Sequence, residues 1–185
     1  MKKLLFCLLI ATALTCSSCN SGNTSTKSDD STTNATSSST NNNNSEEDRE
    51  KRNEQVVLSF FDDFNKKDIN GAFQYCATNF TDYGDPTTPK PMPLDSSKAM
   101  LNTWMTAFPD FSVQNPKAVA DGDTVMVWST NAGTWKGDLM GHKATGKSFK
   151  FQDVDIFILN DDGKITEHHN IQPFSTIAQQ IGLKM

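Results

Sequence analysis

Apolar and polar residues alternate most regularly in the last third of the chain, and this alternation is typical of strands. The predicted strands cover residues 111–115, 117–120, 125–134, 149–159 and 164–172. The last two are separated by Asn-Asp-Asp-Gly at residues 160–163, and an apolar run that stops at Asp-Gly and restarts at Lys-Ile is a strong hairpin signal. We therefore expect an antiparallel meander that organises the rest of the chain.

Helical spacing of apolar residues precedes these strands and returns at the C-terminal end. The predicted helices cover residues 45–67, a short stretch after Asp68, residues 95–108 and residues 175–181. Ser45 opens the first helix because Ser-Glu-Glu-Asp has the form of a capping box. Residues 78–93, rich in Gly and Pro, are expected to form a long exposed loop. Three helices followed by an antiparallel sheet predict an α+β fold.

Residues 1–18 have the organisation of an export signal, with two lysines, an apolar run over residues 4–14 and then small residues. The apolar run is shorter than the roughly 20 residues that a membrane span requires. Cys19 follows two serines, so the segment resembles the lipobox of bacterial lipoproteins, in which such a cysteine carries the lipid. Cys16 is the alternative lipidation site. The alternative to a lipoprotein signal is an ordinary secretion signal that is cleaved without lipidation.

Residues 19–45 consist almost entirely of Ser, Thr and Asn and lack large apolar side chains. Such a composition cannot bury enough surface to offset the entropy of ordering, so we expect a disordered tether. The tether would hold the folded domain, residues 46–185, away from a membrane that the chain reaches through its lipid. The expected location is therefore the bacterial cell envelope.

Charge and cysteine content narrow the function classes. Without Lys2 and Lys3 the chain keeps 15 of its 17 basic residues against 22 acidic ones, and this net charge near −7 argues against a nucleic-acid partner. Cys76 is the single cysteine left beside a lipidated Cys19, so no disulfide framework is expected. Its place in a helical stretch predicts a small buried side chain. No Cys or His cluster has metal-ligand spacing, so no metal is expected.

Short motifs follow one another in a fixed order along the second half of the chain. They are Ala107-Phe-Pro-Asp110, Asp121-Gly-Asp123, Gly133-Thr134, Gly137, Gly141, Thr145-Gly-Lys147, Asp155-Ile-Phe157, Asp162-Gly-Lys-Ile165, Glu167 and Gln180-Ile-Gly182. This series resembles the SnoaL-like polyketide cyclase or ester cyclase group of the nuclear transport factor two-like superfamily. The likeness covers roughly residues 56–183. It implies a cone-shaped fold, with three N-terminal helices packed on a curved, mostly antiparallel sheet around an apolar cavity.

The resemblance also implies a reaction, namely closure of a polyketide ring by aldol condensation without a metal or other cofactor. In the family a buried Asp on the last strand acts as general acid and base. The matching position here is Pro173, which cannot transfer a proton.

Strand alternation and the resemblance together give candidate acid/base residues. A period of two puts Glu167 and His169 on one face of the last strand, and in the family this face lines the cavity together with the position of Asp155. We expect these three residues in acid/base roles, because carboxylates in a cavity have raised pKa values and histidine titrates near neutral pH. The alternative is that Glu167 and His169 form a buried structural pair.

Four aromatic residues are candidates for contact with a ligand, namely Tyr83, Trp104, Trp135 and Phe151. Two of them have a second interpretation. Tyr83 can belong to a solvated loop tip, and Trp104 can belong to the core, because Met100, Leu101, Trp104, Met105 and Phe108 share one helical face.

Three functions follow from these features. The first is an envelope lipoprotein with an internal pocket for a small, largely apolar molecule, and it is favoured by Pro173 and by the tether. The second is a cofactor-free acid/base enzyme of the cyclase, isomerase or hydrolase type. The third is a non-catalytic scaffold that forms a homodimer through the open face of its sheet.

Overall fold

A computed structural model describes residues 39–184, with side-chain surroundings given from Ser45 onward. The helices are α1 (Ser39–Asn65), α2 (Ile69–Phe73), α3 (Leu94–Ala107) and α4 (Ser175–Ile181). The strands are β1 (Cys76–Gly84), β2 (Met92–Pro93), β3 (Ser112–Asp121), β4 (Thr124–Thr134), β5 (Ser148–Leu159) and β6 (Ile165–Asn170). The predicted export signal and most of the predicted tether lie outside the described residues. None of the described helices is long and apolar enough to cross a membrane.

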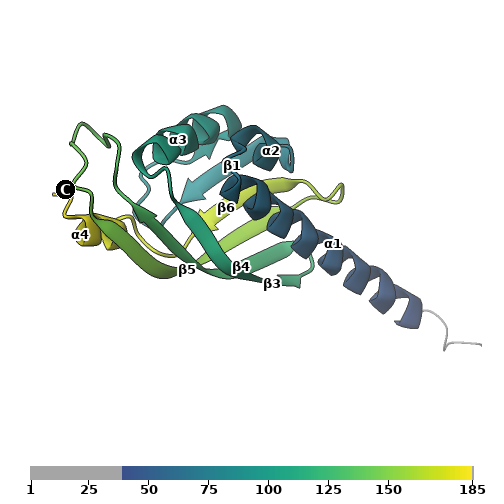
Figure 1. Cartoon of the computed structure of the whole chain (residues 1–185). Coiled ribbons are helices and arrows are strands. Elements are labelled where there is room, and N and C mark those ends of the chain that lie inside the picture. Colours follow the sequence, from purple (N-terminus) through teal and green to yellow (C-terminus); the bar gives the residue numbers. More distant parts are fainter. Residues whose placement is uncertain (1–38, 185) are drawn as a thin grey trace, which may run out of the picture. The chain divides into compact units, whose positions relative to one another are not determined.

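The strands form one curved sheet in the order β2-β1-β6-β5-β4-β3. Its pairings are antiparallel except between β1 and β6, which run parallel. Figure 1 shows α1, α2 and α3 gathered on one side of this sheet. We call the sheet face under these helices the inner face and the opposite one the outer face. The arrangement confirms the predicted α+β fold of helices on a mostly antiparallel sheet.

Aromatic side chains fill the space between α1 and the inner face. Phe60 and Phe61 of α1 lie with their ring centroids 5.8 and 5.6 Å from that of Phe157 on β5. Phe64, one turn further along the helix, meets Phe111 edge-on at 5.6 Å. Edge-to-face contacts at these distances favour one fixed packing, so the helix and the sheet hold each other in register.

Several local predictions are confirmed where a short-range signal sets the structure. Asp68 caps α2 by accepting a hydrogen bond from the Gly71 amide at 2.8 Å. Gly163 closes the turn between β5 and β6 with a φ of 72°, a conformation that glycine adopts at little cost. Helix α4 has the predicted bounds.

The predicted loop over residues 78–93 is wrong at both ends, because β1 runs from Cys76 to Gly84 and Met92–Pro93 form the short strand β2 that pairs with it. Cys76 accordingly starts a strand and is not helical, although its side chain is buried as expected. Thr, Asn and Asp in this segment suggested turns, and β1 gains its stability from pairing with β6, some 90 residues away.

Two further boundaries differ from the predictions. Residues 111–115 and 117–120 belong to one strand, β3, which bulges where Asn115 takes a φ of 52° and Pro116 lacks an amide proton. Helix α1 begins at Ser39, ahead of the predicted capping box at Ser45. Asn has a low helix propensity, so the run of asparagines before Ser45 gave no sign of this earlier start.

Candidate functional site

Two aspartates of β5, Asp153 and Asp155, point to the inner face, as the family resemblance implied for Asp155. Pairing with β4 sets Asp153 opposite Ser129 and Asp155 opposite Val127. Their exposed fractions are only 5% and 4%. Phe157 shares this face, so both carboxyl groups enter the interior beside aromatic core.

A bulge in β6 determines which histidine joins them. Ile165 pairs with Leu159, but the next paired residue, Glu167, lies opposite Ile158, so Thr166 is an extra residue in the strand. A bulge reverses the alternation beyond it.

The expectation that Glu167 and His169 share a face with Asp155 is therefore wrong. His169 pairs with Ile156 on the outer face, whereas His168 pairs with Phe157 and Asn170 pairs with Asp155 on the inner face.

His168 bridges two carboxylates in the interior. Its Nδ1 lies 3.1 Å from Asp82 Oδ1 and its Nε2 lies 3.2 Å from Asp155 Oδ1. Burial by itself would lower the pKa of His168, but its hydrogen bonds to Asp155 and Asp82 and their negative charges raise it to about 10. Burial likewise opposes ionisation of Asp82, yet His168 and the Gly84 amide lower its pKa overall. The ring is therefore an imidazolium between two carboxylates at neutral pH.

Asp153 differs from these carboxylates because no cation of residues 45–184 pairs with it directly. Its Oδ1 accepts hydrogen bonds from the amides of Val154 at 2.8 Å and Gln172 at 3.1 Å. Burial and the neighbouring charge of Asp155 outweigh these bonds and raise the pKa of Asp153 to about 6. Its carboxyl group can therefore exchange a proton near neutral pH.

Three buried polar atoms beside these groups have no hydrogen-bond partner among the described residues. They are Ser129 Oγ, Asn131 Oδ1 and Asp155 Oδ2. Asn170 donates to Asp155, but to its other oxygen. The residues that gather here form what we call the inner polar cluster: Asp82, Ser129, Asn131, Asp153, Asp155, His168 and Asn170. Buried polar atoms are nearly always paired, so the three orphans mark this cluster as a candidate site.

The aromatic residues proposed as ligand contacts separate into three environments. Phe151 lies on the inner face opposite Asn131. The ring centroid of Phe149 lies 5.9 Å from that of Phe151 and 6.5 Å from that of half-buried Trp104, so Phe149 connects the two. Trp135 is almost fully buried, and its indole Nε1 donates to the Gly137 carbonyl at 2.6 Å. Trp135 is therefore engaged by the chain itself.

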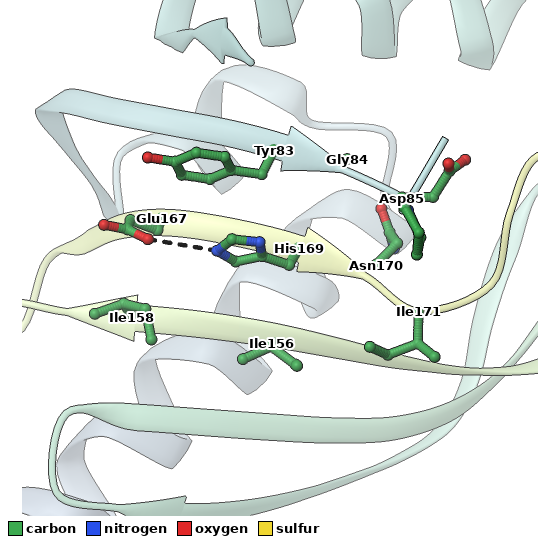
Figure 2. Close-up of a pocket in the computed structure, with 10 residues that line it drawn as sticks. Tyr83, Gly84, Asp85, Ile156, Ile158, Glu167, His169, Asn170 and Ile171 are labelled. Atoms are coloured by element: carbon green, nitrogen blue, oxygen red, sulfur yellow. Dashed lines mark hydrogen bonds and ion pairs between the residues drawn. The ribbon is translucent and has the colours of Figure 1, made fainter. Parts of the chain in front are cut away.

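Tyr83 lies on the outer face, where its ring stacks on His169 with 4.5 Å between centroids. Glu167 reaches the same ring, with 3.4 Å between its Oε2 and His169 Nε2. Figure 2 shows these three side chains beside Ile156 and Ile158. Together they line an open depression with a volume of about 460 Å³. Glu167 and His169 thus form the pair that was the alternative expectation, but at a partly exposed position.

Five members of the inner polar cluster were not placed at the site from the sequence, namely Asp82, Ser129, Asn131, His168 and Asn170. Ser129 and Asn131 alternate with Val127 along a strand that was predicted correctly, so the same period of two could have found them. Asp82 was hidden because its segment was taken for a loop. The inner position of His168 depends on a single extra residue in β6, and no local sequence pattern predicts that extra residue. In residues 39–184 no group of His, Cys, Asp and Glu has the geometry of a metal site.

Comparison with known proteins gives a consistent result. The sequence model of the SnoaL-like polyketide cyclase family matches residues 55–181. No curated protein sequence matches the chain.

Solved structures match over most of the domain. A candidate SnoaL-like polyketide cyclase from Jannaschia sp. CCS1 is 19% identical with a TM-score of 0.66, over 74% of this chain and 96% of the other. AclR, a candidate hydroxylase from Streptomyces galilaeus, is 19% identical with a TM-score of 0.63, over 73% and 98%. IdmH, a candidate polyketide cyclase from Streptomyces antibioticus, is 21% identical with a TM-score of 0.61, over 70% and 98%. At these identities the likeness establishes the fold.

Proposed function

Because this chain belongs to the SnoaL-like polyketide cyclase family, we propose that it binds a small, largely apolar molecule against the inner polar cluster. The observation that carries the proposal is the set of three orphan atoms on Ser129, Asn131 and Asp155. Each buried polar atom without a partner costs about 1–3 kcal/mol, more for a charged group. A polar group of a bound molecule would remove that cost.

The surroundings of the cluster suit the apolar part of such a molecule. Phe151 continues the inner face beyond Asp153, and Trp104 packs against Phe174 with 6.1 Å between ring centroids. These three aromatic side chains are half-buried, so part of their surface remains to be covered. Apolar walls with a few polar groups are the usual composition of small-molecule sites.

A second candidate function is cofactor-free acid/base catalysis on such a molecule, and the raised pKa of Asp153 favours it. Asp153 and Asp155 are two residues apart on the same face, so both side chains can contact one bound molecule. Glu167 and His169 cannot share that role, since the sheet separates them from Asp155. In this version Asp153 exchanges the proton that the family's aspartate exchanges from the position of Pro173.

We also propose that the protein is exported and anchored in the cell envelope through lipid on Cys19. The support is the sequence of residues 1–19, which lie outside the described part of the chain. Mass spectrometry of the N-terminal peptide from membranes tests this point. A diacylated or triacylated cysteine would support it, whereas an intact Met1 would refute it.

The outer face favours a homodimer. Val119, Met126 and Trp128 expose 64%, 46% and 48% of their surface on neighbouring strands β3 and β4. Soluble monomers rarely expose a continuous apolar patch of this kind, and two sheets pack well face to face. Light scattering of the full chain would then give twice the monomer mass, and Trp128→Lys would give the monomer mass. A monomeric wild type would refute the dimer.

The proposed pocket can be tested with three small probes, namely 2-phenylethylamine, 2-phenylethanol and phenylacetate, added to the isotope-labelled full chain. At about 10 mM, where ligands of this size bind measurably, at least one probe should shift the NMR signal of the Trp104 indole. The indole of Trp128 on the outer face is the internal control. If no probe shifts Trp104 more than Trp128, the proposed pocket is wrong.

A further inference from the structure

We infer that the molecule bound at the inner polar cluster carries an ammonium group, that is, a protonated primary or secondary amine. The inference rests on the proposed pocket and specifies the class of its ligand. It follows from the hydrogen-bond valence, the charge and the aromatic surroundings of the cluster.

The valence of the orphan atoms calls for hydrogen-bond donors. Asp155 Oδ2 belongs to a carboxylate in contact with His168, and an ionised carboxylate can only accept. Ser129 Oγ can accept or donate, and the Asn131 amide can turn either end toward a partner. The one orphan with a fixed requirement therefore needs a donor, and a ligand carbonyl or enolate oxygen cannot supply one.

The strand register places two orphans where one ammonium group could reach both. Ser129 lies opposite Asp153, so it is the diagonal neighbour of Asp155 on the adjacent strand. Residues at such diagonal positions are about 7–8 Å apart. We therefore expect that one ligand group lying between the two side chains would reach both. Asn131 follows two residues along β4 on the same face and is available to a second donor of the ligand.

The charge of the inner polar cluster is negative, which suits a positively charged ligand group. It contains three carboxyl groups, on Asp82, Asp153 and Asp155, and His168 is its one side chain that becomes cationic. The charges with the largest effect on Asp153 are those of Asp155 and His168, and two backbone amides donate to it. The carboxyl groups of the cluster therefore outnumber its one cation. A cation would be attracted there, and an anion would be repelled.

Aromatic rings adjoin the acidic groups on the side away from Phe157. Phe151 precedes Asp153 by two residues on the inner face, and Trp104 and Phe174 continue this aromatic wall through Phe149. The faces of such rings attract ammonium groups. Carboxylates on one side and aromatic rings on the other form the usual surroundings of a bound amine.

The same three probes test the inference, because they share a phenylethyl frame and differ in charge. At pH 7 the full chain should bind 2-phenylethylamine about ten- to a hundredfold more tightly than 2-phenylethanol, which is the range for a hydrogen bond to a charged group. Phenylacetate should bind most weakly. Equal or tighter binding of the alcohol or of phenylacetate at the Trp104 signal would overturn the inference and leave the pocket standing.

Two variants locate the effect. Asp155→Asn should remove most of the preference for the amine. Ser129→Ala should weaken amine binding several-fold, which corresponds to the loss of one hydrogen bond. Ser129 Oγ has no hydrogen-bond partner among the described residues, so we expect this variant to fold even where Asp155→Asn does not. Thr130→Ala, on the outer face of the same strand, is the matched control and should leave binding unchanged. Amine binding that is insensitive to both Ser129→Ala and Asp155→Asn would place the amine elsewhere and refute the inference.

Discussion

The same substitution should cost very different amounts of stability at the two adjacent histidines of β6. His168 is 17% exposed and bridges Asp82 and Asp155, whereas His169 is 37% exposed and contacts Glu167, itself 41% exposed. We predict that His168→Gln destabilises the fold strongly and that His169→Gln, its matched control, costs less than about 1 kcal/mol, as is usual for exposed pairs.

The magnitude for His168 can be worked out from its pKa. A rise from 6.5 to about 10 corresponds to on the order of 4–5 kcal/mol, at 1.36 kcal/mol for each unit of pKa. Removal of one partner from a buried ion pair costs about 3–5 kcal/mol, since the other charge stays buried and unpaired. We therefore expect a loss of about 3–5 kcal/mol at pH 7 in urea unfolding followed by circular dichroism.

The pH dependence provides an independent check. The folded pKa of His168 lies above its unfolded value, so its stabilisation is complete below pH 6.5 and is lost as the pH rises through about 10. The difference in unfolding free energy between wild type and His168→Gln should therefore shrink between pH 7 and pH 10. The reasoning is refuted if His168→Gln costs no more than His169→Gln, or if the difference stays constant over this range.

Two further predictions concern single buried groups. The folded pKa of Asp153 is raised to about 6, so ionising this carboxyl group costs stability at high pH. Asp153→Asn should therefore stabilise the protein by up to ~3 kcal/mol at pH 8, and the gain should vanish near pH 4. An equal effect at both pH values in urea unfolding would contradict this. Burial raises the pKa of the Cys76 thiol to about 12, so a thiol reagent at pH 8 should not modify it in the folded protein. Mass spectrometry should find the modified peptide only after urea unfolds the chain. Rapid modification of the folded protein would contradict the burial of Cys76.

Much of the fold could be predicted because its signals are local. The alternation in β4 and β5, the Asp-Gly turn before β6 and the Asp68 cap of α2 each act within a few residues. Strand β1 escaped prediction because its sequence is rich in turn-forming residues and its partner β6 is remote in the chain. Local propensity could not reveal a parallel pairing of this kind.

The candidate site was predicted in part, and the wrong choice of histidine has a single cause. The inner position of Asp155 was expected from the family resemblance, since alternation alone allowed either face of β5, and the strand register agrees with it. Strict alternation in β6 chose His169 over His168. This choice is wrong because one extra residue at Thr166 reverses the faces of that strand. A bulge changes the face of every later residue in its strand while leaving the composition unchanged, so sequence alone could not select the correct histidine.

The measurement that tests the central claim most directly is a high-resolution crystal structure of the full chain, purified from its own host and examined by mass spectrometry for a co-purified small molecule. We predict density for a bound molecule within hydrogen-bond distance of Asp155 Oδ2 and Ser129 Oγ, the atoms that now lack partners. Ordered waters that satisfy both atoms in a closed interior, with no molecule detected, would contradict the account.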